Sequence, residues 1–84
     1  MKILFAENAW EDYVYWQNTD KKMVKRINQL IKEIQRDPFK GMGNPEPLKF
    51  NWTGYWSRRI NLEHRLVYKV QGDAISIAQC RYHY

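Results

Sequence analysis

The 84-residue chain is poor in the residues that build cross-linked or metal-bound scaffolds. It has one cysteine, Cys80, and two histidines. A single thiol excludes an internal disulfide and a cysteine-based metal site, which favours a cytoplasmic protein. No apolar run is long enough for a membrane span or a secretory signal. The length predicts one domain, residues 1–84, with a small core.

Motifs for cofactor and metal chemistry are missing as well. The sequence contains no phosphate-binding P-loop, no dinucleotide fingerprint and no Gly-x-Ser-x-Gly elbow. The two histidines do not form the helical His-x-x-x-His pair that is typical of zinc enzymes. We therefore expect a protein that uses neither a metal nor a cofactor.

Basic residues outnumber acidic ones, and they are unevenly distributed. The formal net charge is +5, with −3 on residues 1–20 and +8 on residues 21–84. A basic body that also contains many aromatic residues is typical of proteins that bind polyanions, because exposed rings can stack on nucleobases. A few net charges also serve plain solubility, so this feature indicates nucleic acid without deciding for it.

The chain begins with the pattern of a strand followed by a helix. Residues 2–6 form a short, mostly apolar run. Asn8, with Glu11 three residues later, has the spacing of a reciprocal cap. This spacing predicts that the first helix starts after Asn8.

A second helix is predicted by apolar residues at helical spacing. They recur between Met23 and Ile34 at intervals of three and four residues, with lysine and arginine on the opposite face. Thr19 or Asp20 is expected to cap this helix. Asp37-Pro38 should end it, because the residue before proline avoids the helical region.

After a loop rich in proline and glycine, the pattern becomes that of strands. The candidates are residues 48–50, 55–60, 64–70 and 74–82, and Gly72-Asp73 predicts a hairpin between the last two. This order predicts an α+β fold with an N-terminal strand and two helices packed on one face of a mostly antiparallel sheet. The opposite face would be free to bind.

The sequence closes with Cys80-Arg81-Tyr82-His83-Tyr84, which places an imidazole and two phenols directly after a strand. Histidine can give or take a proton near neutral pH. In a basic protein, such a group suggests a site that handles phosphate. A short polar tail that happens to contain His83 would look the same.

The charged groups of the strands and of the Pro/Gly loop supply a carboxylate, an imidazole and an excess of cations. That set suits RNA cleavage by the substrate's own 2′-OH, which needs a base, an acid and cations around the phosphorane, but no metal. Glu46 is the best-placed carboxylate, because Pro45 and Pro47 stiffen its backbone. Glu63 is a rival base.

The candidate cations differ in the side of the sheet that their side chains are expected to face. Arg65 should face the binding side, because the other side of its strand is apolar. Lys49 is a weaker candidate of the same kind. Arg58 and Arg59 are adjacent on a strand, so at most one of them can reach a given site. Each of these residues could also be an ordinary surface residue.

One point of strand register stays open. A two-residue turn at 72–73 would place His83 on the face opposite Arg65 if the strand stayed regular. A three-residue loop, or a tail that bends away at Tyr82, would return both to one side.

Several stretches are shared with a known family. The most specific are Glu63-His64-Arg65-Leu66-Val67-Tyr68 and the closing Tyr82-His83-Tyr84, accompanied by Trp10-Glu11-Asp12-Tyr13, Pro45-Glu46-Pro47-Leu48-Lys49 and Trp56-Ser57-Arg58-Arg59-Ile60. Along its whole length the chain resembles the YoeB toxins of the RelE superfamily.

This resemblance implies a fold similar to RelE and the microbial ribonucleases. It implies the toxin of a type II toxin–antitoxin system, an mRNA interferase that cuts messenger RNA in the ribosomal A site and inhibits translation. By position it also implies roles for six residues: Glu46 as general base, His83 as general acid, Arg65 as transition-state clamp, Lys49 and Arg59 as phosphate and RNA contacts, and Tyr84 as support for the site.

The implied partners are a YefM-like antitoxin, a ribosome with bound mRNA, and a second copy in a homodimer. Operator DNA would be bound only through the antitoxin complex, and no membrane is involved. The alternative is a non-catalytic toxin of the same fold that blocks the ribosome or a DNA topoisomerase by binding. A free-standing RNA-binding module is a third possibility. The set of Glu46, Arg65 and His83 discriminates among them, because a pure binder does not need it.

Overall fold

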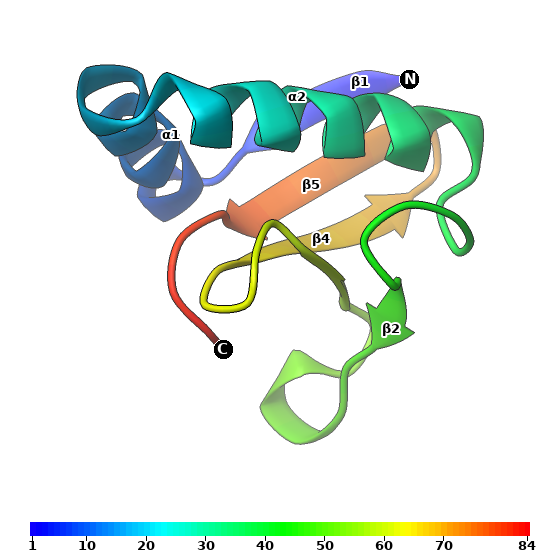
Figure 1. Cartoon of the computed structure of the whole chain (residues 1–84). Helices are drawn as coiled ribbons and strands as arrows, with labels where there is room; N and C mark the ends of the chain where they lie inside the picture. Colours follow the sequence, from blue (N-terminus) through cyan, green and yellow to red (C-terminus); the bar gives the residue numbers. More distant parts are fainter.

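A five-stranded sheet with two helices on one of its faces forms the protein, as the computed structural model of residues 1–84 shows (Figure 1). The elements are β1 (Lys2–Phe5), α1 (Glu7–Thr19), α2 (Lys21–Arg36), β2 (Glu46–Pro47), the 3₁₀ turn η1 (Phe50–Trp52), β3 (Trp56–Arg59), β4 (Arg65–Gln71) and β5 (Ala74–Gln79). The strand order is β1-β5-β4-β3-β2, and only β1 and β5 pair in parallel. The predicted α+β fold is therefore confirmed. Neither helix combines the length and the apolar character needed to cross a membrane.

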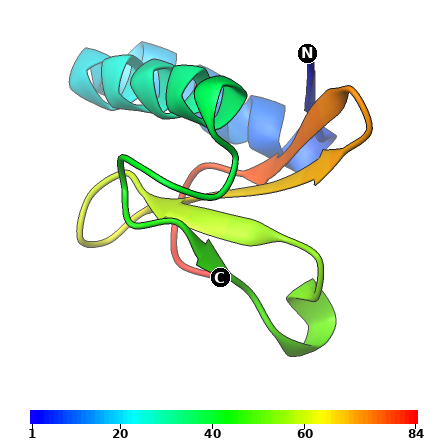
Figure 2. The same cartoon turned by 90° about the vertical axis from the view of Figure 1, so that its right-hand side faces the viewer.

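Helix α2 contributes most of the helical side of the core. Its N-cap is Asp20, whose carboxylate accepts a hydrogen bond from the Lys22 N–H at 3.0 Å, and the helix ends before Asp37-Pro38, as predicted. Five apolar residues on one side of α2 are buried: Met23, Ile27, Leu30, Ile31 and Ile34. They belong to one cluster with Leu66, Tyr68, Ile75 and Ile77 of the sheet. Figure 2 shows both helices on the same side of the strands.

Helix α1 differs from the prediction at its start. The cap expected at Asn8 is wrong, because the helix begins at Glu7 and its N-cap residue, Ala6, makes no side-chain cap. The Ala6 N–H instead donates to the Ile77 carbonyl at 2.9 Å. Pairing with β5 therefore fixes where the chain turns into the helix.

The strand predicted at residues 48–50 is also wrong. The pairing with β3 is confined to Glu46–Pro47, and η1 starts at Phe50. The Trp52 N–H donates to the Lys49 carbonyl at 3.1 Å, which closes a turn where a regular strand would continue. A short edge strand and a protruding turn result.

The β4–β5 hairpin resolves the open question of register. The turn has two residues, since Gln71 pairs with Ala74. A β-bulge follows, because Val67 pairs with Gln79 while Tyr68 pairs with Ile77. One extra residue in β5 reverses which side chains face which side. Strand β5 then ends at Gln79, earlier than predicted.

Candidate functional site

The candidate residues of the strands lie on the sheet face that the helices leave uncovered. Glu46 pairs with Ser57, and Arg59, two residues further along β3, pairs with Arg65. Paired residues share a face of the sheet, as do alternate residues of one strand. Glu46, Arg59 and Arg65 therefore share the face opposite the core. The predicted orientation of Arg65, away from the apolar side of its strand, is confirmed.

Residues 80–84 leave β5 and turn back toward β2, on the side away from the helices (Figure 2). The bulge in β5 puts Gln79 on this side, where its amide Nε2 donates to the carbonyls of Arg81 at 3.2 Å and His83 at 3.4 Å. Tyr82 has a φ of 66°, in the left-handed region. The bend predicted as one way of uniting the tail with Arg65 is present at Tyr82.

Two further hydrogen bonds join this segment to the candidate residues. The Arg65 N–H donates to the Tyr82 carbonyl at 3.0 Å. The phenol of Tyr84 donates to Oε1 of Glu46 at 3.3 Å. Residues 38 positions apart in the sequence thus touch, and His83 lies between the two contacts in the chain.

The imidazole of His83 is exposed and has one free nitrogen. Its ring centroid lies 4.6 Å from that of Tyr84, and Nδ1 is 3.2 Å from the Tyr84 carbonyl oxygen. Nε2 makes no hydrogen bond within the chain. This arrangement leaves Nε2 available to exchange a proton with a bound molecule.

Arg65 uses only part of its guanidinium group internally. Nη1 donates to the carbonyls of Asn61 at 2.7 Å, Leu62 at 3.1 Å and His64 at 3.2 Å, which orders the turn between β3 and β4. Nε and Nη2 have no partner in the chain. A guanidinium held on one side and free on the other is suited to bind a phosphate in a fixed orientation.

A cavity of about 510 Å³ lies beside the hydrogen bond between Tyr84 and Glu46. Its wall is formed by residues 46–52 and by Tyr84, so that Glu46, Lys49 and Tyr84 all line it. Glu63, the rival base, lies outside it and is 3.6 Å from Nε2 of His64. The cavity therefore combines a carboxylate, a phenol and a cation, whereas Arg59, Arg65 and His83 are not among the residues that line it.

Three side chains outside the cavity hold the tail in place, and none of them was predicted from the sequence to do so. Asp12 accepts a hydrogen bond from the Cys80 N–H at 3.1 Å, and Trp16 Nε1 donates to the Cys80 carbonyl at 2.9 Å. His64 Nδ1 accepts from the Tyr82 N–H at 2.7 Å. Burial raises the pKa of Asp12, and the bond from Cys80 opposes that rise. One sequence signal was available for two of them: Asp12 and Trp16 lie four residues apart, which places them on the same side of a helix.

Arg58, the neighbour of Arg59, points the other way and is fully buried. Its guanidinium donates to the Tyr68 hydroxyl at 3.1 Å and to carbonyls of the loop that leads to β2, namely Asp37 at 2.6 Å, Lys40 at 3.0 Å and Met42 at 3.0 Å. The Tyr68 hydroxyl in turn donates to the Pro38 carbonyl at 2.6 Å. Arg58 therefore orders the loop before Glu46, and only Arg59 is free to meet a ligand.

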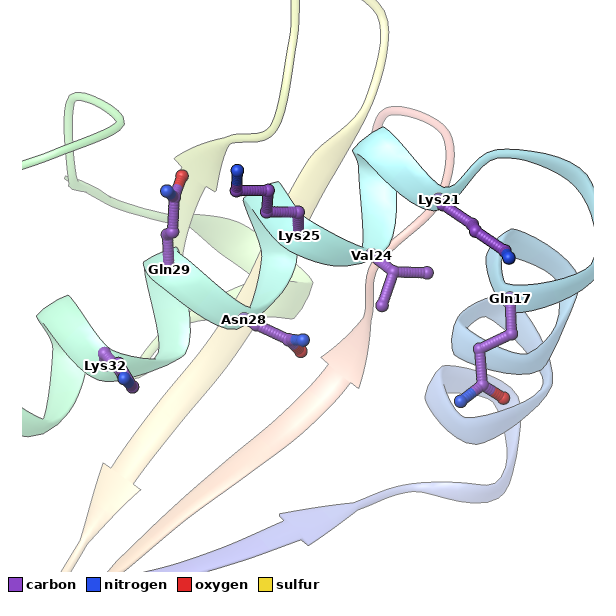
Figure 3. A pocket seen from close by; sticks show the side chains of 7 residues that line it. All are labelled: Gln17, Lys21, Val24, Lys25, Asn28, Gln29 and Lys32. Carbon is purple, nitrogen blue, oxygen red and sulfur yellow. The ribbon is translucent and has the colours of Figure 1, made fainter.

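A second cavity, of about 520 Å³, lies on the outer side of α2 (Figure 3). Its charged residues are Lys21, Lys25 and Lys32, and the others are Gln17, Val24, Asn28 and Gln29. It contains neither a carboxylate nor an imidazole, so it offers no group for proton transfer near neutral pH. It is a basic surface, separate from the candidate site.

Comparisons with known proteins identify the family of the chain. Residues 5–84 match the family model of the YoeB-like toxin of bacterial type II toxin-antitoxin system. The chain is 61% identical to Toxin YoeB of Escherichia coli (strain K12) over 84 residues, which is the full length of both. Among solved structures, the YoeB/ParE toxin from Agrobacterium tumefaciens is 51% identical, with a TM-score of 0.98 and complete coverage of both chains.

YoeB from Staphylococcus aureus is 58% identical and has been solved in two forms. One is a dimer, with a TM-score of 0.94, and the other is a heterotetrameric YoeB-YefM toxin-antitoxin complex, with a TM-score of 0.93. Both alignments cover 100% of this chain and 98% of the other. A family match over nearly the whole length, together with relatives of this identity, establishes the family. The chain belongs to the YoeB-like toxins of bacterial type II toxin–antitoxin systems.

Proposed function

We propose that this toxin is a ribosome-dependent endoribonuclease that cleaves mRNA in the ribosomal A site and thereby inhibits translation. The observation that carries the proposal is the hydrogen bond between Tyr84 and Glu46. It ties the segment that bears the imidazole to the strand that bears the carboxylate. The face on which Glu46 lies also carries Arg65 and Arg59.

The proposed reaction is attack of the RNA 2′-oxygen on the adjacent phosphorus, with cleavage of the bond from phosphorus to the 5′-oxygen. Glu46 takes the proton from the 2′-OH, and His83 gives a proton to the departing 5′-oxygen. The products are a 2′,3′-cyclic phosphate and a 5′-hydroxyl, so charge and protons balance. Each proton transfer typically contributes about 10²- to 10⁴-fold in rate.

Cations complete the site in this proposal. The unpartnered Nε and Nη2 of Arg65 bind the phosphoryl oxygens as negative charge builds in the transition state. Lys49, in the cavity wall, and Arg59, exposed on β3, contact the RNA backbone on either side. Tyr84 orients Glu46 through its phenol.

The ribosome is the proposed carrier of the substrate because positive charge lies on two opposite sides of the protein. The candidate site occupies one face of the sheet, while Lys21, Lys25 and Lys32 line a cavity beyond the other face. A protein inserted between structured RNA and a messenger strand meets phosphates on both sides. A YefM-like antitoxin and a homodimer are proposed from the Staphylococcus aureus relative, which has been solved with YefM and as a dimer.

Mapping of mRNA 5′ ends after expression tests the proposal. We expect discrete new ends near start codons for the wild-type toxin and none for His83→Gln or Glu46→Ala, with all three proteins folded. Glu7→Ala is the matched control, because it removes an exposed carboxylate of α1 that does not line the cavity, and it should cut normally. Arrest of translation with intact messages would instead support the non-catalytic toxin. Wild-type cutting by both site variants would disprove the assigned mechanism.

A further inference from the structure

We propose that Phe50 is a stacking platform for one nucleobase of single-stranded RNA, next to the linkage that is cut. The identity of the ligand rests on the function proposed above. Three features of Phe50 support the platform itself: its exposure, its backbone conformation and its position in the cavity wall.

Phe50 is 91% exposed, although it is a large apolar residue. Its φ is 57°, in the left-handed region that bulky side chains rarely occupy. Burial therefore does not explain why phenylalanine stands here, and backbone conformation disfavours it. Strained residues of this kind concentrate at ligand sites, where the surrounding structure holds them in place.

The turn around Phe50 supplies that hold. The Phe50 carbonyl accepts hydrogen bonds from the N–H of Thr53 at 3.1 Å and from its hydroxyl at 2.7 Å. Behind the turn, the Trp52 ring packs edge-on against Tyr55, with 5.2 Å between centroids, and Lys69 Nζ lies 5.5 Å from the Tyr55 ring. These hydrogen bonds and ring contacts hold the turn in place. The Phe50 side chain projects from it without a partner.

The location of the ring favours a nucleotide over an apolar ligand. Phe50 shares the cavity wall with Glu46, Lys49 and Tyr84. Lys49 directly precedes it and is exposed, so one cation and one aromatic face lie side by side in the chain. Alternating phosphate and base is the pattern that such a pair recognises, and stacking on a ring accepts any base. The ring would hold a flanking base while Glu46 reaches the sugar.

A fluorescent oligonucleotide tests the platform without relying on cleavage. The probe is a short single-stranded DNA containing 2-aminopurine, which lacks the 2′-OH and is not cut, measured with the full-length toxin at low salt. We expect stacking to quench its fluorescence. Phe50→Tyr should keep the quench, whereas Phe50→Leu should lose it and bind roughly 5- to 150-fold more weakly, the range given by about 1–3 kcal/mol per stacked base. Leu62→Ala, an equally exposed apolar residue, is the matched control and should bind like the wild type.

A glycine variant separates stacking from a structural role. Phe50→Gly relieves the positive φ, so its unfolding temperature should equal or exceed that of the wild type while the quench is lost. Equal quenching by the wild type and Phe50→Leu would overturn the platform, and so would a lower unfolding temperature for Phe50→Gly. Failure of the proposed ribonuclease would show itself differently, as absence of cleavage by a wild-type toxin that still quenches the probe.

Discussion

The Nδ1 atom of His64 accepts a hydrogen bond of 2.7 Å from the backbone N–H of Tyr82, directly before His83. His64 is buried, with its ring edge-on to Trp16 at 4.9 Å between centroids. A lone pair at Nδ1 requires the neutral imidazole with its proton on Nε2. His64 thus positions the segment that carries His83, whereas the imidazole of His83 itself is exposed.

His64→Leu should therefore lower both stability and activity. Loss of the acceptor leaves the Tyr82 N–H without its partner, which we expect to cost about 1–3 kcal/mol in the free energy of unfolding. The mispositioned His83 should reduce cleavage about 10-fold or more. His64→Asn restores an acceptor near the position of Nδ1 and should recover most of the activity. Urea unfolding and single-turnover cleavage measure the two effects, and equal rates for both variants would contradict the positioning role.

The buried Arg58 should matter for stability, in contrast to its exposed neighbour. Arg58→Met removes the donor to three loop carbonyls and to Tyr68, so we expect a loss of at least about 3 kcal/mol in the free energy of unfolding. Arg59→Met changes an exposed side chain and should stay within about 0.5 kcal/mol of the wild type while cleaving more slowly. Chemical denaturation compares the pair. Equal stabilities would show that the loop does not depend on Arg58.

The raised pKa of Asp12 should make the stability of the protein depend on pH. Its pKa is raised from the ordinary value of 3.8, chiefly by burial. The folded state therefore binds the proton more tightly than the unfolded state, which adds to the free energy of unfolding. This added stability is complete below pH 3.8 and is lost as the pH rises through the raised pKa of the folded state. Asp12→Asn cannot titrate and should lack this part of the curve. Unfolding free energies of both proteins between pH 3 and pH 7 measure it, and parallel curves would contradict the prediction.

Cys80 should be chemically inert in the folded protein. It is fully buried, and burial raises its pKa to about 12. Only about one thiol in ten thousand is then ionised at pH 8, and the thiolate is the reactive form. Iodoacetamide should label the native protein extremely slowly and the guanidinium-unfolded protein at an ordinary rate. Rapid labelling of the native protein would mean that the tail opens readily.

The lysines of the α2 cavity should affect attachment to the ribosome without affecting chemistry. Lys25→Gln with Lys32→Gln removes two exposed cations that no carboxylate pairs with. For binding to ribosomes, log affinity decreases with the logarithm of the salt concentration, and the magnitude of this slope should be smaller by about 2 in the double variant. Lys2→Gln with Lys40→Gln removes the same charge elsewhere and is the control. Identical slopes for the two double variants would exclude this surface.

The sequence predicted well those parts of the fold that depend on local periodicity. The spacing from Met23 to Ile34 gave α2 correctly, and strand parity separated Arg58 from Arg59. Parity left the side of the tail open, because the one unpaired residue between Ile77 and Gln79 reverses the alternation and leaves no mark in composition. The cap at Asn8 failed because pairing of Ala6 with Ile77, a distant contact, fixed the helix start.

The site was predicted less completely. Glu46, Arg65 and His83 have chemistry that can be recognised in isolation, whereas Asp12, Trp16 and Gln79 gain importance only through their bonds to the tail. The helical spacing of Asp12 from Trp16 places both on one side of α1, but it does not reveal their partner, Cys80, which lies more than 60 positions away.

The hydrogen bonds that hold residues 80–84 come from α1, from the turn before β4 and from the end of β5. The segment is therefore held by three separate parts of the fold. A molecule that is only partly folded, or that lacks α1, loses some of these bonds, and we expect His83 to lie away from Glu46 in it. Under the proposed mechanism we expect such copies to be inactive, so that toxicity requires a completely folded molecule.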